Sequence, residues 1–112
     1  MTIDSPSLSR QVRVLVVEDD DTLRTVLAAE LSNKGYRVQE AESGNKALAM
    51  LRKMTPDVIL LDIRMPGLDG LDVLERIRAE ELSDAAVIIL TGHGTIALAV
   101  EGMKAGAAEF IT

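Results

Sequence analysis

Residues 57–70 read Asp-Val-Ile-Leu-Leu-Asp-Ile-Arg-Met-Pro-Gly-Leu-Asp-Gly, and this stretch decides the predicted fold. The run 58–61 is apolar throughout and includes two β-branched residues, after which Asp62 opens a loop rich in Pro, Gly and Asp. A short run that is apolar on both faces and closed by turn residues is typical of a buried parallel strand. Ligands of open α/β sheets bind beyond the carboxyl ends of the strands. Asp62 is therefore either a cap of the turn or a residue that takes part in chemistry.

The composition indicates one globular domain. The chain has 112 residues, of which 47% are hydrophobic and 27% charged, and it has no cysteine, which excludes disulfides and thiolate metal sites. No apolar run approaches the ~20 residues that span a bilayer, and the first nine residues do not resemble a signal peptide. We therefore expect a cytoplasmic protein without a membrane partner. The net charge of −6 argues against direct contact of this domain with nucleic acid.

Strand-like and helix-like segments alternate along the chain. A polar leader is predicted at residues 1–10, and strands are predicted at 12–17, 36–40, 58–62, 86–90 and 108–111. Apolar residues at helical spacing predict a helix after each of the first four strands. Alternation of this kind indicates a parallel sheet with helices on both faces and right-handed crossovers. The two most apolar strands, 12–17 and 58–61, should be central neighbours.

The ends of the predicted helices rest on individual residues. Asp20 or Asp21 should cap the first helix, Gly35 should stop it, and Pro56 should end the second helix. The third helix should run to about Glu81, and the fourth should include the apolar residues between 96 and 103.

Acidic residues follow both of the most apolar strands. Glu18 and Asp19 come directly after 12–17, and Asp62 ends 58–62, so adjacency of the strands would bring three carboxylates into one crevice. Two unit charges ~4 Å apart repel by roughly 4 kcal/mol at an effective dielectric of 20. Because oxygen is the only ligand type nearby, a hard cation such as Mg²⁺ is the expected compensation. The alternative is that the acidic stretch only caps a helix, which we prefer for Asp20 and Asp21.

A carboxylate at a metal site can also act as a nucleophile toward a phosphoryl group, giving an acyl phosphate. Asp62 is the candidate, because it stands alone at its strand end. Thr91, after the fourth predicted strand, either offers a hydroxyl to the new phosphoryl group or caps the loop. Phe110, on the last strand, is by itself more typical of the core.

At this point the residues resemble a family, the receiver domains of two-component response regulators. The motifs are Val-Val-Glu-Asp-Asp at 16–20, Leu-Leu-Asp-Ile-Arg-Met-Pro-Gly-Leu-Asp-Gly at 60–70, Ile-Leu-Thr-Gly-His-Gly at 89–94 and Lys-Ala-Gly-Ala-Ala-Glu-Phe-Ile at 104–111. The Thr-Gly-His-Gly form resembles regulators of the nitrogen-regulation and nitrogen-fixation classes. The resemblance implies a flavodoxin-like (CheY-like) doubly wound sheet of five parallel strands in the order 2-1-3-4-5.

The resemblance also implies roles for individual residues. Asp62 would accept a phosphoryl group from a histidine kinase, while Glu18 and Asp19, together with Asp62 and the backbone carbonyl of Arg64, would hold Mg²⁺. Thr91 would then bond the phosphoryl group as the switch residue. Phe110 would act as the aromatic switch that follows Thr91 inward, and we expect no catalytic role for His93. The implied output is a conformational switch in a phosphorelay, with control of transcription as the most common output.

One departure from the family concerns the end of the sequence. The family places a lysine, and then a fifth helix, directly after the position of Thr112. We therefore interpret residues 11–112 as a receiver domain that is incomplete at its carboxyl end, a fragment of a longer protein. The face that a fifth helix would cover suggests a homodimer or a borrowed helix, which light scattering would test.

Three other functions remain open on the sequence alone. A Mg²⁺-dependent phosphatase with an aspartyl nucleophile usually has a second Asp two residues later, where this chain has Arg64. A nucleotide- or flavin-binding module would need a first loop rich in Gly, Ser or Thr, where this chain has Glu-Asp-Asp-Asp. A pseudo-receiver that only binds other proteins is disfavoured by Asp62 and Thr91. The preferred reading is a switch that is not an enzyme, beyond self-phosphorylation and self-dephosphorylation.

Overall fold

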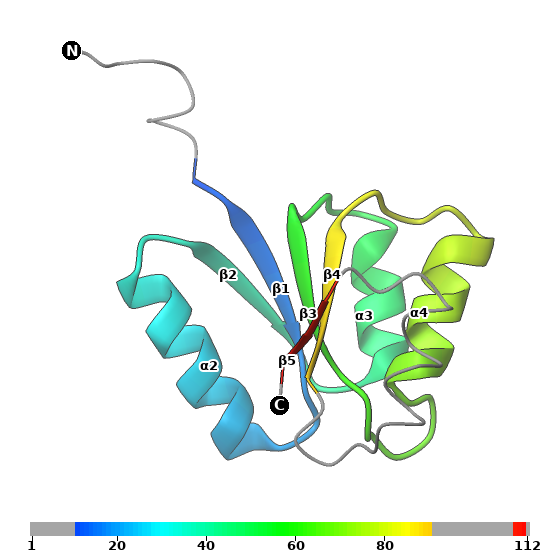
Figure 1. The fold of residues 1–112 in the computed structure, drawn as a ribbon, viewed down its shortest axis with the longest axis horizontal. Helices are drawn as coiled ribbons and strands as arrows, with labels where there is room; N and C mark the ends of the chain where they lie inside the picture. Colours follow the sequence, from blue (N-terminus) through cyan, green and yellow to red (C-terminus); the bar gives the residue numbers. More distant parts are fainter. Residues whose placement is uncertain (1–10, 91–108, 112) are drawn as a thin grey trace.

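Five parallel strands form one sheet, in the order β2-β1-β3-β4-β5, in the computed structural model, which describes residues 11–90 and 109–111 (Figure 1). The strands are β1 (Arg13–Val17), β2 (Arg37–Ala41), β3 (Val58–Asp62), β4 (Ala86–Leu90) and β5 (Glu109–Ile111). The described helices are α2 (Asp21–Asn33), α3 (Gly44–Leu51) and α4 (Gly70–Ala79). This strand order confirms the flavodoxin-like fold, and β1 and β3 are the predicted central neighbours. The predicted leader and the predicted fourth helix lie outside the described residues.

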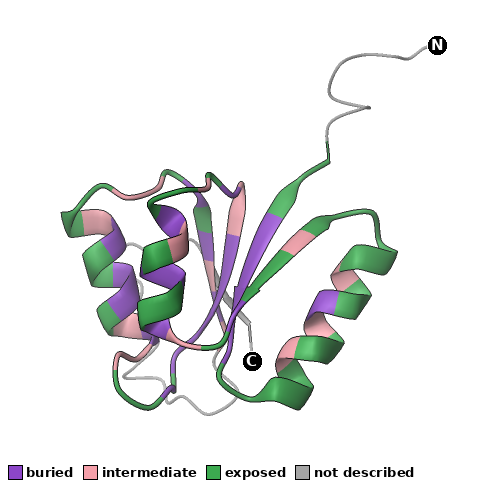
Figure 2. Cartoon of the chain, turned by 180° about the vertical axis from the view of Figure 1, so that it is seen from behind, coloured by how far each residue is buried: buried purple, intermediate pink, exposed green. Residues whose placement is uncertain are grey.

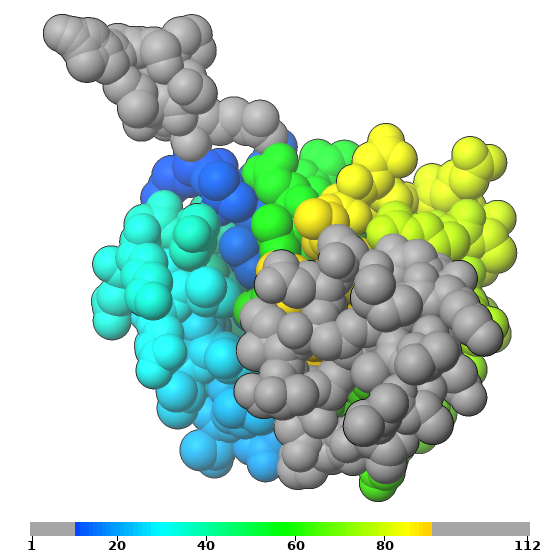
Figure 3. Space-filling model, in the orientation of Figure 1, coloured from blue at the N-terminus to red at the C-terminus, as the bar shows by residue number. Residues whose placement is uncertain are grey.

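The helices lie on both faces of the sheet, because alternate residues of the apolar strands point to opposite sides (Figure 2). On one face, Leu15, Ile59 and Val87 join a large buried cluster that includes Val73 of α4. On the other face, a smaller cluster around Val16 packs against α2. Figure 3 shows α2 and α4 at opposite flanks of the molecule. The sheet is therefore the middle layer of three.

Strand β3 occupies the centre and is paired on both sides. Leu60 is in register with Val16 of β1 and Ile88 of β4, so the backbone of β3 has hydrogen-bonding partners along both edges. Its side chains from Ile59 to Leu61 are at most 9% exposed. The unbroken apolar run of the sequence reflects this double burial.

Asp57 precedes β3 and ties the amino ends of three strands together. Its carboxylate Oδ2 accepts the backbone N–H of Arg13 at 2.9 Å. Its own N–H donates to the carbonyl of Arg13 at 2.8 Å, and its carbonyl accepts the N–H of Ala86 at 3.1 Å. Asp57 thus links the starts of β1, β3 and β4 through backbone groups.

The helix boundaries agree with the sequence at the start of α2 and differ at two ends. Asp20 is the N-cap of α2 and accepts the Leu23 N–H at 2.9 Å, as predicted. The prediction that Pro56 ends the second helix is wrong, because α3 ends at Leu51 and leaves a turn before the proline. The third helix ends at Ala79 rather than near Glu81, whose φ of 51° is left-handed and incompatible with a continuing helix. No helix in the described ranges has the length and apolar character to cross a membrane.

Candidate functional site

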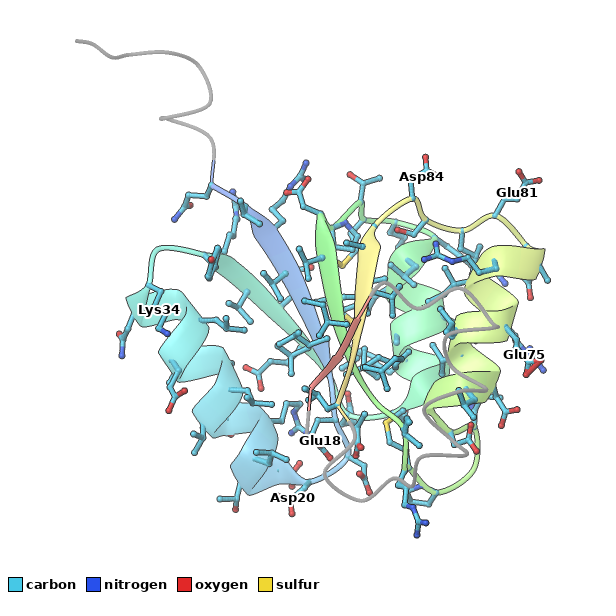
Figure 4. All side chains as sticks on the ribbon, in the orientation of Figure 1. Glu18, Asp20, Lys34, Glu75, Glu81 and Asp84 are labelled. Atoms are coloured by element: carbon cyan, nitrogen blue, oxygen red, sulfur yellow. The ribbon has the colours of Figure 1, made fainter. Side chains whose placement is uncertain are left out.

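Three carboxylates from two neighbouring strands converge at the carboxyl edge of the sheet. Glu18 and Asp19 follow β1, Asp62 ends β3, and each offers an oxygen within 4.8 Å of those of the others. Glu18 is 2% exposed and Asp62 is 4% exposed, whereas Asp19 is open to solvent. Figure 4 shows Glu18 at this edge, close to Asp20 at the start of α2. The cluster is therefore buried on the protein side and open on one side.

The burial and crowding of these carboxylates change the pKa of Glu18. Its pKa is raised from 4.5 to about 7, mainly by burial and in addition by the Asp62 carboxylate, while a hydrogen bond from the Asp20 backbone opposes the change. That hydrogen bond joins the Asp20 N–H to Glu18 Oε2 at 3.1 Å. The protein alone thus leaves more negative charge in the crevice than its own donors balance, and a proton or a cation can make up the difference.

The chemistry of the cluster suits a hard divalent cation. All three side chains are carboxylates, and the chain has neither cysteine nor, among the described residues, a histidine beside them. Mg²⁺ binds through one or two carboxylates and retains coordination positions for water or phosphate oxygens. The open side at Asp19 leaves room for such ligands. The residues present therefore fit Mg²⁺, with Glu18, Asp19 and Asp62 as the side chains that would hold it.

The loop after β3 holds Asp62 in place. The backbone N–H of Arg64 donates to Asp62 Oδ1 at 3.2 Å, which fixes one carboxylate oxygen. The N–H of Ile63 donates to the carbonyl of Leu90 at 3.3 Å, so the main chain stays attached to β4 just past the acidic residue. The carboxylate is thus oriented by backbone groups on a rigid strand end.

Gly70 allows the start of α4 to fold back onto this strand end. Its N–H donates to the carbonyl of Ile63 at 2.9 Å. A Cβ at this position would overlap the carbonyl oxygen of Asp62 and lie 2.7 Å from the Cα of Ile63. Only glycine accepts this approach, so Gly70 couples the position of α4 to the backbone of Asp62.

A hollow of about 400 Å³ lies along the same loop. It is lined by Ile63, Arg64, Met65, Pro66, Asp69 and Leu71. Because the loop begins directly after Asp62, the hollow lies next to the acidic cluster along the chain.

The other residues predicted for the site have different placements. Asp21 forms an ion pair with Arg24, in agreement with a role at the helix start. Phe110 belongs to β5, where it is in register with Ile89, and its side chain lies outside the described part of the structure. Thr91 and His93 lie outside the described residues.

Arg24 was not among the residues predicted for the site. Its guanidinium group contacts the main chain of Glu18 and two acidic side chains, and only 14% of its side chain is exposed. The spacing of Asp21 and Arg24, three residues apart on a helix, was the available signal. The contact with the main chain has no signature in the sequence.

Comparisons with known proteins agree with this fold. Residues 14–112 match the family described as response regulator receiver domain. The transcriptional regulatory protein AfsQ1 of Streptomyces coelicolor is 39% identical over 98 residues, which cover 88% of this chain and 43% of that protein.

Two solved structures are also similar. The chemotaxis protein CheY4 of Vibrio cholerae has a TM-score of 0.86 and 28% identity, over 92% of this chain and 87% of that chain. A response regulator of Burkholderia pseudomallei, solved with a phosphorylated aspartic acid, a calcium ion and citrate, has a TM-score of 0.81 and 29% identity. That match covers 88% of this chain and 57% of that chain.

The match to AfsQ1 covers only part of the length of this relative, so it identifies a domain and not the activity of a whole protein. The chain spans less than half the length of AfsQ1. The family match nevertheless covers residues 14–112, a range that includes nearly all of the parallel sheet. The chain belongs to the family of response regulator receiver domains of two-component systems.

Proposed function

We propose that this domain accepts a phosphoryl group on Asp62 from the phosphohistidine of a histidine kinase, and that Mg²⁺ at Glu18, Asp19 and Asp62 is required. The observation that carries the proposal is the convergence of the three carboxylate oxygens within 4.8 Å at the end of a buried strand. Phosphoryl transfer depends mainly on positioning and on neutralising charge, and this edge of the sheet is built for both.

The proposed step uses one oxygen of Asp62 as the nucleophile. A new O–P bond forms as the P–N bond to the kinase imidazole breaks, and the imidazole nitrogen keeps the bonding electron pair and takes up a proton. Bound Mg²⁺ supplies neutralisation of the charge on the phosphoryl oxygens. The Arg64 N–H, which already donates to Asp62 Oδ1, orients the carboxylate before the transfer.

The low exposure of Asp62 favours this role over that of a surface acid. Asp62 is only 4% exposed, so a donor has to approach it from the solvent-exposed side of the cluster at Asp19. Thr91 as the switch residue, Phe110 as the aromatic switch and the Arg64 carbonyl as a further metal ligand complete the proposal.

The output is proposed at the level that the relatives support. AfsQ1 is named a transcriptional regulatory protein, and this chain is similar to less than half of it. We infer that the phosphorylated state controls an output domain, with transcription as the expected output and the cytoplasm as the place of action. Phosphorylation would act by shifting the balance between two conformations of the loops at the site.

A phosphodonor experiment tests the acceptor assignment. The full chain is incubated with acetyl phosphate and MgCl₂, and the acyl phosphate is measured by intact-protein mass spectrometry. We expect phosphorylation of the wild-type chain, none of Asp62→Asn, and none when EDTA removes the metal. Asp57→Asn, just before the other end of β3, is the matched control, and it should be phosphorylated like the wild type.

The outcomes separate this proposal from its alternatives. Phosphorylation that persists in Asp62→Asn would refute the assignment of the acceptor. A wild-type chain that binds Mg²⁺ but is never phosphorylated, by acetyl phosphate or by a kinase, would favour the pseudo-receiver. Turnover of a free phosphoester would favour a phosphatase, which the position of Arg64 disfavours.

A further inference from the structure

Arg24, on α2, contacts residues of three different elements. Its Nη1 donates to the carbonyl oxygen of Glu18 at 2.9 Å, in the loop between β1 and α2. Its Nη2 donates to Asp21 Oδ1 at 2.6 Å in the first turn of α2, and its Nε donates to Glu40 Oε1 at 3.3 Å on β2. With 14% of its side chain exposed, Arg24 is well packed for a charged residue.

These contacts fix the peptide from which the metal-binding side chains extend. The N–H of Glu18 donates to the carbonyl of Ala41 at 3.1 Å, while its carbonyl accepts from Arg24. The backbone N–H and the backbone carbonyl of Glu18 are thus both hydrogen-bonded to residues outside the loop. The carbonyl of Glu18 belongs to the peptide bond that leads to Asp19, so the bond from Arg24 sets the direction in which Asp19 leaves the strand.

We propose that Arg24 is a positioning residue of the metal site, whose guanidinium group holds the Glu18–Asp19 peptide in the orientation that binds Mg²⁺. The proposal rests on the proposed function, since it concerns the same site. The planar guanidinium group suits the role, because it can reach several acceptors at fixed angles, which a lysine ammonium cannot reproduce. Outer residues that orient metal ligands typically change metal affinity by 10- to 100-fold when they are replaced.

A purely electrostatic role and a positioning role of Arg24 predict opposite changes in Mg²⁺ affinity when Arg24 is replaced, which makes the proposal testable. A positive charge near a cation site weakens cation binding through repulsion, so removal of a mere neighbouring charge would tighten Mg²⁺ binding. Removal of a positioning residue would weaken binding in spite of the added negative charge. The direction of the change therefore distinguishes the two roles.

The experiment measures Mg²⁺ binding to the full chain by isothermal titration calorimetry. We expect Arg24→Gln to weaken the affinity roughly tenfold and Arg24→Lys, which keeps the charge, to weaken it in the same direction. Arg52→Gln is the matched control, because Arg52 forms one exposed ion pair, with Glu80 at 3.1 Å, and should leave the affinity unchanged.

A second readout uses phosphorylation by acetyl phosphate. In Arg24→Lys the Mg²⁺ concentration for half-maximal rate should rise, while the rate at saturating Mg²⁺ stays near that of the wild type. A loss of overall stability alone would not shift the half-saturating concentration of the folded protein. Arg24→Lys also serves if Arg24→Gln fails to fold.

The results also separate this inference from the proposed function. If the wild-type chain shows no response to Mg²⁺, both are refuted. If the wild type responds and the Arg24 variants bind Mg²⁺ with equal or higher affinity, only the positioning role is refuted. Weaker binding in both variants, with Arg52→Gln unchanged, supports it.

Discussion

Two aspartates bracket strand β3, and their surroundings differ in kind. Asp57, before the strand, accepts the Arg13 N–H at 2.9 Å and joins the amino ends of three strands. Asp62, at the other end, lies within 4.8 Å of two further carboxylates. Glu18 belongs to the carboxyl edge, whereas Asp84 and Glu81 lie at the opposite end of the molecule (Figure 4).

The difference between the two ends separates structure from function. At Asp57 the fold places backbone donors and acceptors around an acid, which stabilises the start of the sheet. At Asp62 the fold places like charges together, and burial, together with this proximity, raises the pKa of Glu18. An arrangement that opposes folding at one edge of an otherwise consistent structure is typical of a functional site.

The largest expected effect is at Gly70, which packs against the backbone of Asp62 and Ile63 at the carboxyl edge of the sheet. Gly70→Ala should lower the free energy of unfolding by about 3 kcal/mol or more, because the new Cβ overlaps the carbonyl of Asp62. Gly35→Ala is the comparison at the amino end. There φ is +95° with open space, and the expected cost is about 1 kcal/mol. Urea denaturation measures both, and equal costs would contradict the close approach at Gly70.

The pH dependence of the free energy of unfolding should reveal the raised pKa of Glu18 at the carboxyl edge. The pKa of Glu18 is about 7 in the folded state and near 4.5 when unfolded, so between these values only the folded state holds the proton. Without metal, the contribution is present below pH 4.5, falls as the pH rises and is lost above about pH 7. Its size is at most about 3 kcal/mol, because solvent on the open side of the cluster screens the charge.

Glu18→Gln supplies the control for this pH dependence. The difference between wild type and Glu18→Gln, from chemical denaturation at a series of pH values in EDTA, isolates the contribution of Glu18 from that of other acids. A difference that stays constant from pH 4.5 to pH 7 would contradict the raised pKa.

Mg²⁺ should stabilise the folded chain through the carboxyl edge alone. At a Mg²⁺ concentration about 100 times the Kd, the stabilisation should be about 2.7 kcal/mol, seen as a rise in Tm. Asp19→Asn should lose most of this rise, whereas Asp57→Asn should keep it. An equal response of both variants would mean that Mg²⁺ binds elsewhere.

The smallest expected effect compares the two aspartates at the ends of β3 directly. In EDTA at pH 8, Asp57→Asn should destabilise the fold by about 1 kcal/mol, because a charge-assisted hydrogen bond becomes a neutral one. Asp62→Asn should stabilise it by about 1 kcal/mol, because the Asn oxygen still accepts the Arg64 N–H while one like charge leaves the cluster. Equilibrium denaturation gives both signs, and the same sign for the two variants would refute the contrast.

Much of this fold could be predicted from the sequence, because its strands carry strong local signals. The run 58–61, followed by Asp62, specifies a buried strand end, and β3 is observed at Val58–Asp62. Asp20 follows the apolar run 12–17 after two further acidic residues and caps α2. Helix ends were less predictable, since α3 ends at Leu51 without a Gly or Pro at its end. Strand order has no periodic signal, so it came from the resemblance to a family.

The site was predictable where it consists of residues that follow strands. Glu18, Asp19 and Asp62 come directly at strand ends, so adjacency of β1 and β3 is enough to bring them together. Arg24 was not predictable, because its bond to the Glu18 carbonyl depends on the path of the main chain. Nor could the pKa of Glu18 be inferred before its burial was known.

Strand β3 has one more consequence for how a signal could leave this domain. Its backbone is hydrogen-bonded to β1 and β4 and its side chains are enclosed by helices, so its amides should exchange with solvent only on global unfolding. A group added to Asp62 is therefore attached to a strand that keeps its conformation. Whatever rearrangement follows has to be taken up by the loops and helix ends around it, with α4 the nearest through Gly70.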